Sequence, residues 1–439
     1  MPVNCCHTRF STTQRGPLAD HSDSFVQANL RRNFLANIFD TAFYMLGLSI
    51  ISQTTVVPLL VSRLTDSKVM IGLAPALANL GMLLPQLLVA NFTEGLRRKM
   101  PFVALFCAFQ RLPLLLIGLA VGLLAGPAPA MALAALLALR TVSALAVGLV
   151  IPAWYDVVAK EIPVAKRGLY AGLSNGAGAL LGIAGAALAG PILAAWPYPR
   201  NFAAAFTVAF LFQAISWGAL TFNREPESVM VKQGKRLAEY VHDLPRVIRQ
   251  DRNYGRYLAV RSLVLLAGMA ASFYIVYAAE RFGIAEGDVG LLTALLVSSQ
   301  AAANPAWGLA ADRIGHKRVL IGEALCIALA ASAAYLAVSP AWLWLTFMLL
   351  GVAVAASSVS ALTIVLEFSG PRERPTYIGL TNTLLAPAAV VAPILGGWLA
   401  GRLGYRAMFT VAALLALLGA LLMAAWVREP RDGARPDLG

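Results

Sequence analysis

The sequence has little charge and few of the side chains that bind metals or form disulfides. Only 13% of its 439 residues are charged and 59% are hydrophobic, whereas about a quarter of a soluble domain is charged. Its four cysteines are split between the polar N-terminal tail and apolar blocks, which suits neither a disulfide framework nor a zinc site. The four histidines are His7, His21, His242 and His316. All lie outside the apolar blocks, so we expect no metal site, no cofactor and no enzyme activity.

Three sequence signals of other protein classes are also missing. The first thirty residues hold no apolar core of about 7–15 residues, so we expect no cleaved signal peptide. No nucleotide-binding P-loop is present, so any transport would be driven by an ion gradient or by the solute's own gradient. No nucleic-acid motif accompanies the net charge of +13. We therefore expect no nucleic-acid partner.

Long apolar blocks are what the sequence has instead. A helix needs about 20 mostly apolar residues to cross a bilayer. Twelve blocks of this kind occur, with approximate limits 33–61, 69–92, 101–125, 129–158, 168–195, 201–222, 257–281, 287–309, 318–338, 341–366, 375–400 and 405–427. The fold class predicted is an all-α polytopic membrane protein with twelve transmembrane helices, embedded in the cell membrane.

The positive charges predict the orientation of the chain. If the N-terminus is cytoplasmic, the inner segments hold 26 Lys and Arg residues and the outer loops hold six. Cytoplasmic loops carry the excess of Lys and Arg in membrane proteins. Both termini are therefore predicted to be cytoplasmic.

A polar stretch at 223–256 divides the chain into two sets of six blocks. Its apolar residues recur at helical spacing between Leu237 and Ile248, with basic residues between them, as in a helix that lies on a membrane surface. A solvated linker is the alternative. The predicted organisation is a cytoplasmic tail (1–32), a first six-helix bundle (33–222), the linker (223–256), a second bundle (257–427) and a C-terminal cytoplasmic tail (428–439).

The two sets of blocks repeat each other. The segment RGLYAGLSN (Arg167–Asn175) aligns with RPTYIGLTN (Arg374–Asn382), and Arg, Tyr, Gly, Leu and Asn coincide. Internal repeats of this kind are common in transporter folds. The repeat predicts two pseudo-symmetric bundles.

A compact polar motif lies between the eighth and ninth blocks, within WGLAADRIGHKRV. It consists of Gly308, Asp312, Arg313, Gly315, His316 and Lys317. Its counterpart between the second and third blocks keeps Glu94, Arg98 and Lys99. A topogenic basic turn would explain the bases, but it would explain neither the acid nor the glycines. With the six-plus-six layout, this motif resembles the signature loop of the major facilitator superfamily. The first-half copy departs from the signature, because Gly95 replaces its Arg and Arg97 its second Gly.

The resemblance implies a secondary transporter that moves a small-molecule substrate by alternating access, as a monomer. It also implies a gate. Asp312 is expected to accept from the positive N-terminus of the helix that begins near Arg167 and Gly168. This contact would hold the cytoplasmic side shut while the outer side is open.

The charged candidates inside predicted spans are Asp40, Arg111, Arg140 and Arg261. Such a charge costs at least about 2.5–3.5 kcal/mol at the bilayer centre, so it is a candidate for function. We favour Arg111 as the partner of Asp40 and keep Arg261 as an alternative. Arg140 is expected to lie about 15 Å deeper. Asp40 could instead lie in the interfacial water layer without a special role.

The resemblance implies that spans one, four, seven and ten line the central path, with contributions from spans two, five, eight and eleven. The uncharged candidates on these spans are Gln53, Asn175, Gln300, Asn304 and Asn382. Each of them would contact substrate or form structural hydrogen bonds between helices.

The functional hypothesis is proton-coupled export of lipophilic, drug-like compounds. Asp40 would exchange its proton for substrate, because an ion pair and a protonated acid exclude each other. One alternative is an uptake permease for a nutrient such as a sugar or an organic anion, with Arg140 or Arg261 binding the anionic group. A receptor or scaffold that keeps the fold without transport is the alternative from another class.

Overall fold

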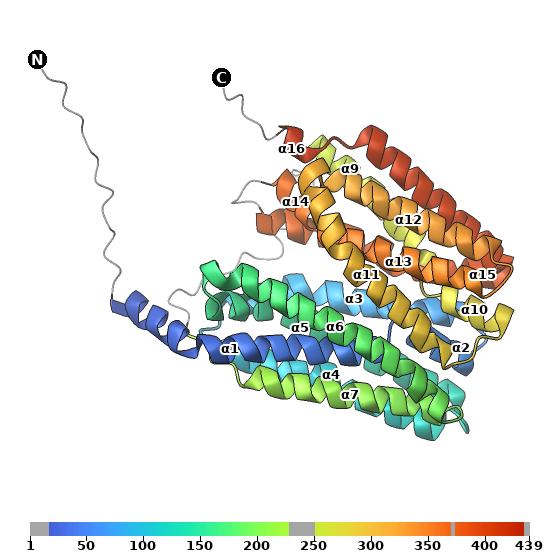
Figure 1. Ribbon diagram of the computed structural model, residues 1–439, viewed down its shortest axis with the longest axis horizontal. Helices are drawn as coiled ribbons and strands as arrows, with labels where there is room; N and C mark the ends of the chain where they lie inside the picture. The colour runs from blue at the N-terminus through green and yellow to red at the C-terminus, as the bar shows by residue number, and fades with distance from the viewer. Residues whose placement is uncertain (1–16, 228–250, 370–373, 434–439) are drawn as a thin grey trace, which may run out of the picture.

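The computed structural model describes residues 17–227, 251–369 and 374–433, and every regular element in these ranges is a helix (Figure 1). The first half contains α1 (Pro17–Ile50), α2 (Val56–Leu64), α3 (Lys68–Glu94), α4 (Met100–Leu124), α5 (Pro129–Glu161), α6 (Val164–Ala195) and α7 (Arg200–Thr221). The second half contains α9 (Arg252–Ala267), η1 (Gly268–Ala270), α10 (Tyr274–Phe282), α11 (Asp288–Ile314), α12 (His316–Leu336), α13 (Ala341–Ser360), α14 (Thr363–Phe368), α15 (Arg374–Trp426) and α16 (Pro430–Gly433). The predicted amphipathic helix of the linker lies outside the described residues.

The twelve-span prediction is confirmed within the described ranges. Nine segments are long and apolar enough to cross a membrane. One of them, within α15, holds two predicted spans that meet at Gly404, whose φ of 86° ends the first helix. The helices α1 and α11 supply the remaining two spans. The chain is therefore a multi-pass membrane protein.

The helices pack as two bundles with the same internal pattern. In the first, α1 packs on α6 and α7, and α5 packs on α3 and α4. In the second, α13 packs on α11 and α12, and α15 packs on α9 and α12. Figure 1 shows the first bundle in blue to green and the second in yellow to red. The bundles contact each other mainly through α3 with α15 and α6 with α11.

Equivalent hydrogen bonds close each bundle at the same end. Asn33 donates to the Arg224 carbonyl oxygen at 2.9 Å and accepts from the Arg224 N–H at 2.9 Å. Asn253 donates to the Arg428 carbonyl oxygen at 2.9 Å and accepts from its N–H at 2.8 Å. Each Arg begins the sequence Arg-Glu-Pro after the last span of its half. The structure thus extends the repeat beyond the segments that the sequence comparison identified.

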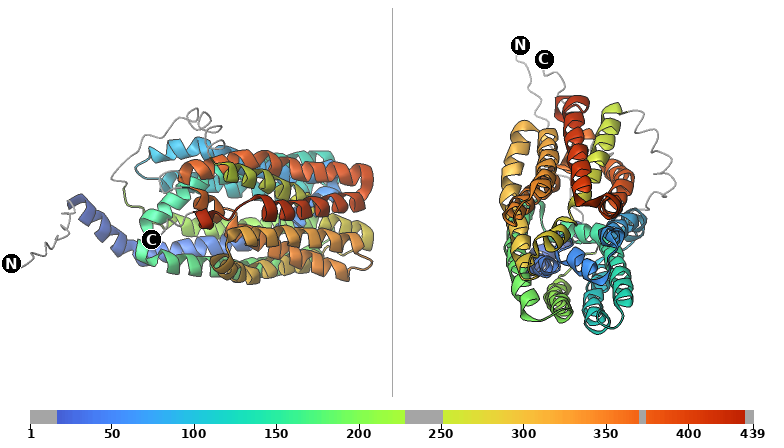
Figure 2. Two further views of the ribbon diagram at one scale, coloured as in Figure 1. Left: turned by 90° about the horizontal axis from the view of Figure 1, so that it is seen from above. Right: turned by 90° about the vertical axis from the view of Figure 1, so that its right-hand side faces the viewer.

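The bundles meet at one end and diverge at the other. We call the end where α1 begins and α16 lies the inner end (Figure 2), because the positive charges predict it to be cytoplasmic. Toward the outer end, a Cβ atom on Gly72 would overlap the Pro393 carbonyl oxygen, and one on Gly290 would overlap the backbone of Gly190. Toward the inner end, a Cβ atom added to Gly168, or to the glycines that follow it on the same face of α6, would meet nothing within 4 Å. The structure is therefore closed outside and open inside.

Candidate functional site

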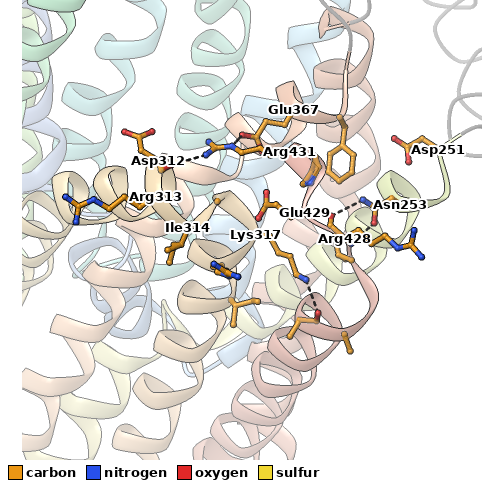
Figure 3. A pocket seen from close by; sticks show the side chains of 18 residues that line it. Asp251, Asn253, Asp312, Arg313, Ile314, Lys317, Glu367, Arg428, Glu429 and Arg431 are labelled. Atoms are coloured by element: carbon orange, nitrogen blue, oxygen red, sulfur yellow. Dashed lines mark hydrogen bonds and ion pairs between the residues drawn. The ribbon is translucent and has the colours of Figure 1, made fainter. Parts of the chain in front are cut away.

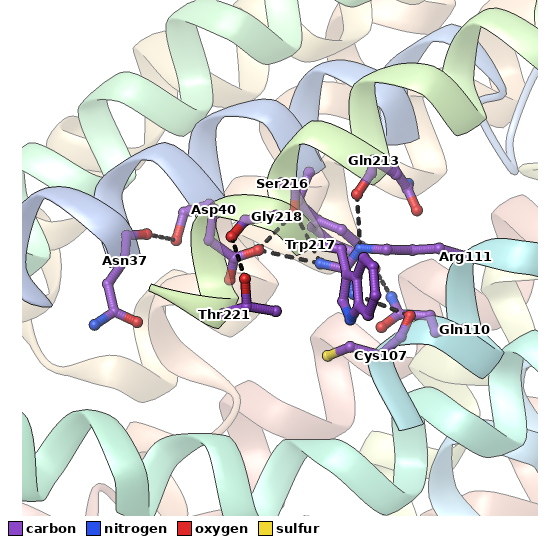
Figure 4. A network of polar contacts seen from close by, with 12 residues as sticks. Asn37, Asp40, Cys107, Gln110, Arg111, Gln213, Ser216, Trp217, Gly218 and Thr221 are labelled. Carbon is purple, nitrogen blue, oxygen red and sulfur yellow. Dashed lines mark hydrogen bonds and ion pairs between the residues drawn. The ribbon is translucent and has the colours of Figure 1, made fainter. Parts of the chain in front are cut away.

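Asp40 on α1 and Arg111 on α4 form a buried ion pair inside the first bundle (Figure 4). An Arg111 guanidinium nitrogen lies 3.1 Å from Asp40 Oδ1, and Arg111 and Asp40 are 4% and 6% exposed respectively. Ser216 on α7 donates to the same oxygen at 2.6 Å. The structure thus places Asp40 beside the partner that the sequence favoured, in a buried site and not in the interfacial water layer.

Backbone carbonyl groups hold Arg111 in place independently of Asp40. Its Nε donates to the Gln213 oxygen at 2.9 Å, and another guanidinium nitrogen donates to the Cys107 oxygen at 3.2 Å. Its guanidinium also lies over the ring of Tyr44, 5.5 Å from the ring centroid. Hydrogen bonds to a charged guanidinium offset part of its desolvation cost. Arg111 can therefore keep its position when the charge on Asp40 changes.

Arg261 on α9 does not contact Asp40, because it forms an ion pair with a different acid. Its guanidinium lies 2.6 Å from Glu323 on α12 and donates to Ser357 on α13 at 2.7 Å. Both charged residues are buried. Sequence reasoning missed Glu323, although it is the acid within the ninth apolar block and intramembrane acids are candidates by default.

The two buried pairs have opposite polarity. In the first bundle the acid is on the first span and the base on the third; in the second bundle the base is on the first span and the acid on the third. Each half of the pseudo-symmetric fold therefore has a buried carboxylate held by a guanidinium between its first and third spans.

Arg140 on α5 differs from the other intramembrane cations. It is 6% exposed, and within the described residues it makes neither an ion pair nor a hydrogen bond. Tyr44 lies close enough to interact with it electrostatically. The Tyr44 hydroxyl in turn accepts from Gln110 at 2.8 Å. Arg140 is thus a buried positive charge with unused hydrogen-bond donors.

The uncharged candidates are not hydrogen-bonded to other parts of the described chain. They are Gln53, Asn175, Gln300, Asn304 and Asn382. Each side chain is exposed or half-buried. Asn79, in contrast, donates to the Ala389 carbonyl oxygen in the other half at 2.9 Å. The structural role weighed for the five candidates therefore finds no support here, and a role in contacting substrate stays a prediction.

A small apolar cavity lies inside the second bundle next to Glu323. It has a volume of about 330 Å³ and lies between α9, η1, α12 and α13. Val264, Ile327 and Leu350 contribute to its apolar wall, and Tyr274 also lines it. The cavity therefore combines an apolar surface with one carboxylate, although Arg261 neutralises much of that charge.

The predicted gating loop forms the turn between α11 and α12 (Figure 3). Gly315 adopts a φ of 90°, a conformation that side-chain-bearing residues rarely adopt. Asp312 and Arg313 are exposed, and Lys317 donates to the Ala424 carbonyl oxygen at 2.9 Å. The loop borders a polar cavity of about 1210 Å³, which Gly308 does not line.

Arg431 on α16 ties this loop to the C-terminal segment. It donates to the Ala311 carbonyl oxygen at 3.0 Å, at the C-terminus of α11, and pairs with Glu367 on α14. A cation at that position also interacts favourably with the helix dipole.

The predicted contact of Asp312 with α6 is not formed in this state. No described hydrogen bond or ion pair joins the Asp312 carboxylate to α6, and Arg167 donates to the Ile162 carbonyl oxygen at 3.1 Å instead. The contact was predicted for the state that is closed inside, whereas this structure is open inside. The clamp therefore stays a prediction.

The first-half copy of the loop is held by ion pairs. Lys99 lies 2.8 Å from Asp156, and Arg98 lies 3.1 Å from Glu227. Glu225, in the Arg-Glu-Pro sequence after α7, accepts from the Lys99 backbone N–H at 2.6 Å. The side chain of Glu94 lies outside the described residues.

At the outer end, polar contacts join the two bundles. Lys68 pairs with Glu280, and Arg63 lies 2.9 Å from Glu286. Thr55 and Thr293 share a buried hydrogen bond of 2.6 Å. These contacts close the path on the side opposite to the opening.

Within the described residues, no group of three or more His, Cys, Asp or Glu side chains could hold a metal ion.

The family model described as Major Facilitator Superfamily matches residues 257–439. The chain is 26% identical over 181 residues to the multi-drug resistance efflux pump PmrA of Streptococcus pneumoniae, covering 40% of this chain and 44% of that protein. It is 30% identical over 162 residues to a Na(+), Li(+), K(+)/H(+) antiporter of Planococcus maritimus, covering 35% and 37%. The chain thus matches less than half the length of these relatives.

Solved structures are similar over nearly the whole chain. A mutant of the nucleoside transporter NupG superposes with a TM-score of 0.69 at 12% identity, covering 90% of this chain and all of that one. The D-xylose-proton symporter has a TM-score of 0.69 at 13% identity, covering 91% and 98%. A bacterial homolog of the human lysosomal transporter Spinster, described as inward-facing, has a TM-score of 0.63 at 13% identity, covering 92% and 95%. At these identities the similarity concerns the fold.

Proposed function

We propose that the chain is a member of the major facilitator superfamily, whose model matches residues 257–439, and that it is a proton-coupled exporter of lipophilic, drug-like compounds. The buried pair of Asp40 and Arg111 is the observation that carries the proposal. Protonation of Asp40 removes the negative charge, so the attraction to Arg111 is present only when the proton is absent. The carbonyl groups of Gln213 and Cys107 keep the guanidinium in place meanwhile.

This pair provides a chemical basis for coupling. In the open-inside state, the ion pair is formed, which corresponds to a proton that has left Asp40. A proton that arrives from the outer side would neutralise Asp40, weaken the contacts between α1, α4 and α7, and favour a different packing of the first bundle. Proton entry and substrate exit are then linked by one bistable element.

The cavity beside Glu323 supports a lipophilic cargo. Its walls are largely apolar, and binding sites for small lipophilic ligands combine such walls with a few polar groups. The free amides on α6, α11 and α15 add polar contacts along the path between the bundles. The efflux pump among the relatives agrees with this choice, although the match covers less than half of it.

Orientation and assembly follow from the same proposal. We infer that both termini are cytoplasmic, so that the open end faces the cytoplasm, and that one chain holds a complete path between its two bundles. The chain would then collect its substrate from the cytoplasm or the inner leaflet.

Purified protein in proteoliposomes tests the proposal. An imposed pH gradient should drive accumulation of a fluorescent lipophilic cation, and collapse of the gradient should abolish it. Accumulation that ignores the pH gradient would rule out proton coupling.

Arg140 favours a second candidate, uptake of an organic anion. Its guanidinium is buried without an acid in the described chain, and a carboxylate or phosphate ligand would supply the missing partner. Transport of organic anions that is lost in Arg140→Gln would support this candidate. Absence of flux for any solute would favour the receptor or scaffold role.

A further inference from the structure

Glu161, the last residue of α5, is a carboxyl group that the proposed ion pair does not use. Its side chain is fully buried, with 0% exposure, at the inner end of the first bundle. Asn37 on α1 donates to its Oε2 at 2.9 Å. Its Oε1 is buried and has no hydrogen-bond partner among the described residues. A buried carboxyl with an unused oxygen atom requires an explanation.

The groups that face Glu161 do not neutralise it. From its own helix, Lys160 lies 3.0 Å from Asp156 and 2.8 Å from Glu225, and it forms no ion pair with Glu161. Beyond α7, Asn223 exchanges hydrogen bonds with Asn37 at 3.1 and 3.2 Å. Glu225 adds a second negative charge to the surroundings.

On the side that faces α6, no ion pair to Glu161 forms among the described residues either. The nearest arginine along the chain there, Arg167, donates to the Ile162 and Ala159 carbonyl oxygens. Tyr170 contributes a buried hydroxyl that makes no well-aligned hydrogen bond in the described chain, although Ser174 lies near it. An ionised carboxylate in such a place has no ion-pair partner in the described chain, since Lys160 is shared with Asp156 and Glu225. Its burial is therefore costly, and a bound proton removes that cost.

Position links Glu161 to Asp40. Asn37, which binds Glu161, precedes Asp40 by about one turn on α1. Tyr170 is close enough to both carboxyl groups to interact with each electrostatically.

We propose that Glu161 binds a proton in this open-inside state and is the group through which the proton of Asp40 leaves to the cytoplasm. As Asp40 pairs with Arg111, it releases its proton; Glu161 Oε1, which lacks a hydrogen-bond partner in the described chain, takes up a proton and passes it to water at the inner end. No bond other than O–H bonds forms or breaks. The role of Glu161 in releasing the proton of Asp40 to the cytoplasm, which we call the exit role, rests on the proposed proton coupling. The claim that Glu161 binds a proton does not depend on that coupling.

Infrared spectroscopy of the purified protein tests the proton itself, without substrate or gradient. Wild type at neutral pH should show the carbonyl band of a protonated carboxyl, and Glu161→Gln should lose it. Asp66→Asn is the control, because it removes an exposed carboxyl at the opposite end of the protein; it should keep the band. A band that persists in Glu161→Gln, or no band in wild type, would overturn the proposal.

A transport measurement tests the exit role separately. Gradient-driven flux should fall at least tenfold in Glu161→Gln, while substrate exchange without a gradient should persist and show that the variant folds. A lost infrared band with unchanged gradient-driven flux would overturn the exit role. If wild type shows the band but no proton-driven flux at all, the proposed function fails while the proton on Glu161 stands.

Discussion

Lys68 and Glu280 come from opposite bundles and form an ion pair at the outer end of the path. We expect this pair to favour the closed-outside state. Their side chains are 20% and 44% exposed, so water screens the interaction and the pair is worth at most about 1 kcal/mol. A membrane-impermeant thiol reagent should therefore label a cysteine introduced at Thr293 about fivefold faster in Lys68→Glu than in wild type, because the new carboxylate and Glu280 repel each other. The exchanged variant Lys68→Glu/Glu280→Lys should return it toward wild type. No recovery in the exchanged variant would show that the pair does not act on this equilibrium.

The close approach of α3 to α15 at Gly72 predicts a stronger effect. A side chain there would overlap the Pro393 backbone, which cannot move aside cheaply. Gly72→Leu should prevent outer closure and make the Thr293 position accessible to a membrane-impermeant thiol reagent. Gly168→Ala is the control, because nothing lies within 4 Å of its added carbon, and it should label like wild type. Equal labelling of Gly72→Leu and wild type would mean that the outer end closes by other contacts.

The predicted contact of Asp312 with α6 can be tested in the Gly72→Leu variant, which should hold the protein open at its outer end. In a Gly72→Leu background, the inner end should close and bring Asp312 to the N-terminus of α6. Cysteines introduced at Asp312 and Gly168 should then crosslink at least several-fold faster than in the open-inside protein. Equal crosslinking in both backgrounds would contradict the clamp.

The buried pair of Arg261 and Glu323 should respond asymmetrically to single and double changes. Removing either partner leaves an uncompensated buried charge, at a cost of about 3–5 kcal/mol. Glu323→Gln and Arg261→Met should therefore lower the thermal unfolding temperature strongly, and the double variant should lower it less than either single change. Additive losses in the double variant would show that the two charges do not stabilise each other.

The sequence predicted those features that depend on local pattern. Apolar length identified the spans, and depth along two helices favoured Arg111 for Asp40. The sequence did not identify Glu323 as the partner of Arg261, because which side chains face each other depends on how far α9 and α12 are rotated about their axes. The sequence also could not show that Glu161 lacks an ion-pair partner, because this follows from the pairing of Lys160 with Asp156 and Glu225.

The repeated pairing of Asn33 with Arg224 and of Asn253 with Arg428 shows another limit of the sequence. Three shared residues, Arg-Glu-Pro, are too few to stand out in a 439-residue chain. Only their equivalent places in the two bundles make the repeat evident.

Proton-driven transport by Asp40→Asn is the decisive measurement for proton coupling through the buried pair. Wild type, Asp40→Asn and the control Asp66→Asn, which changes an exposed acid near the outer end, would be compared in proteoliposomes with and without a pH gradient. We expect Asp40→Asn to lose gradient-driven transport and to keep substrate exchange without a gradient, while Asp66→Asn behaves like wild type. Gradient-driven transport by Asp40→Asn with unchanged pH dependence would contradict coupling through Asp40.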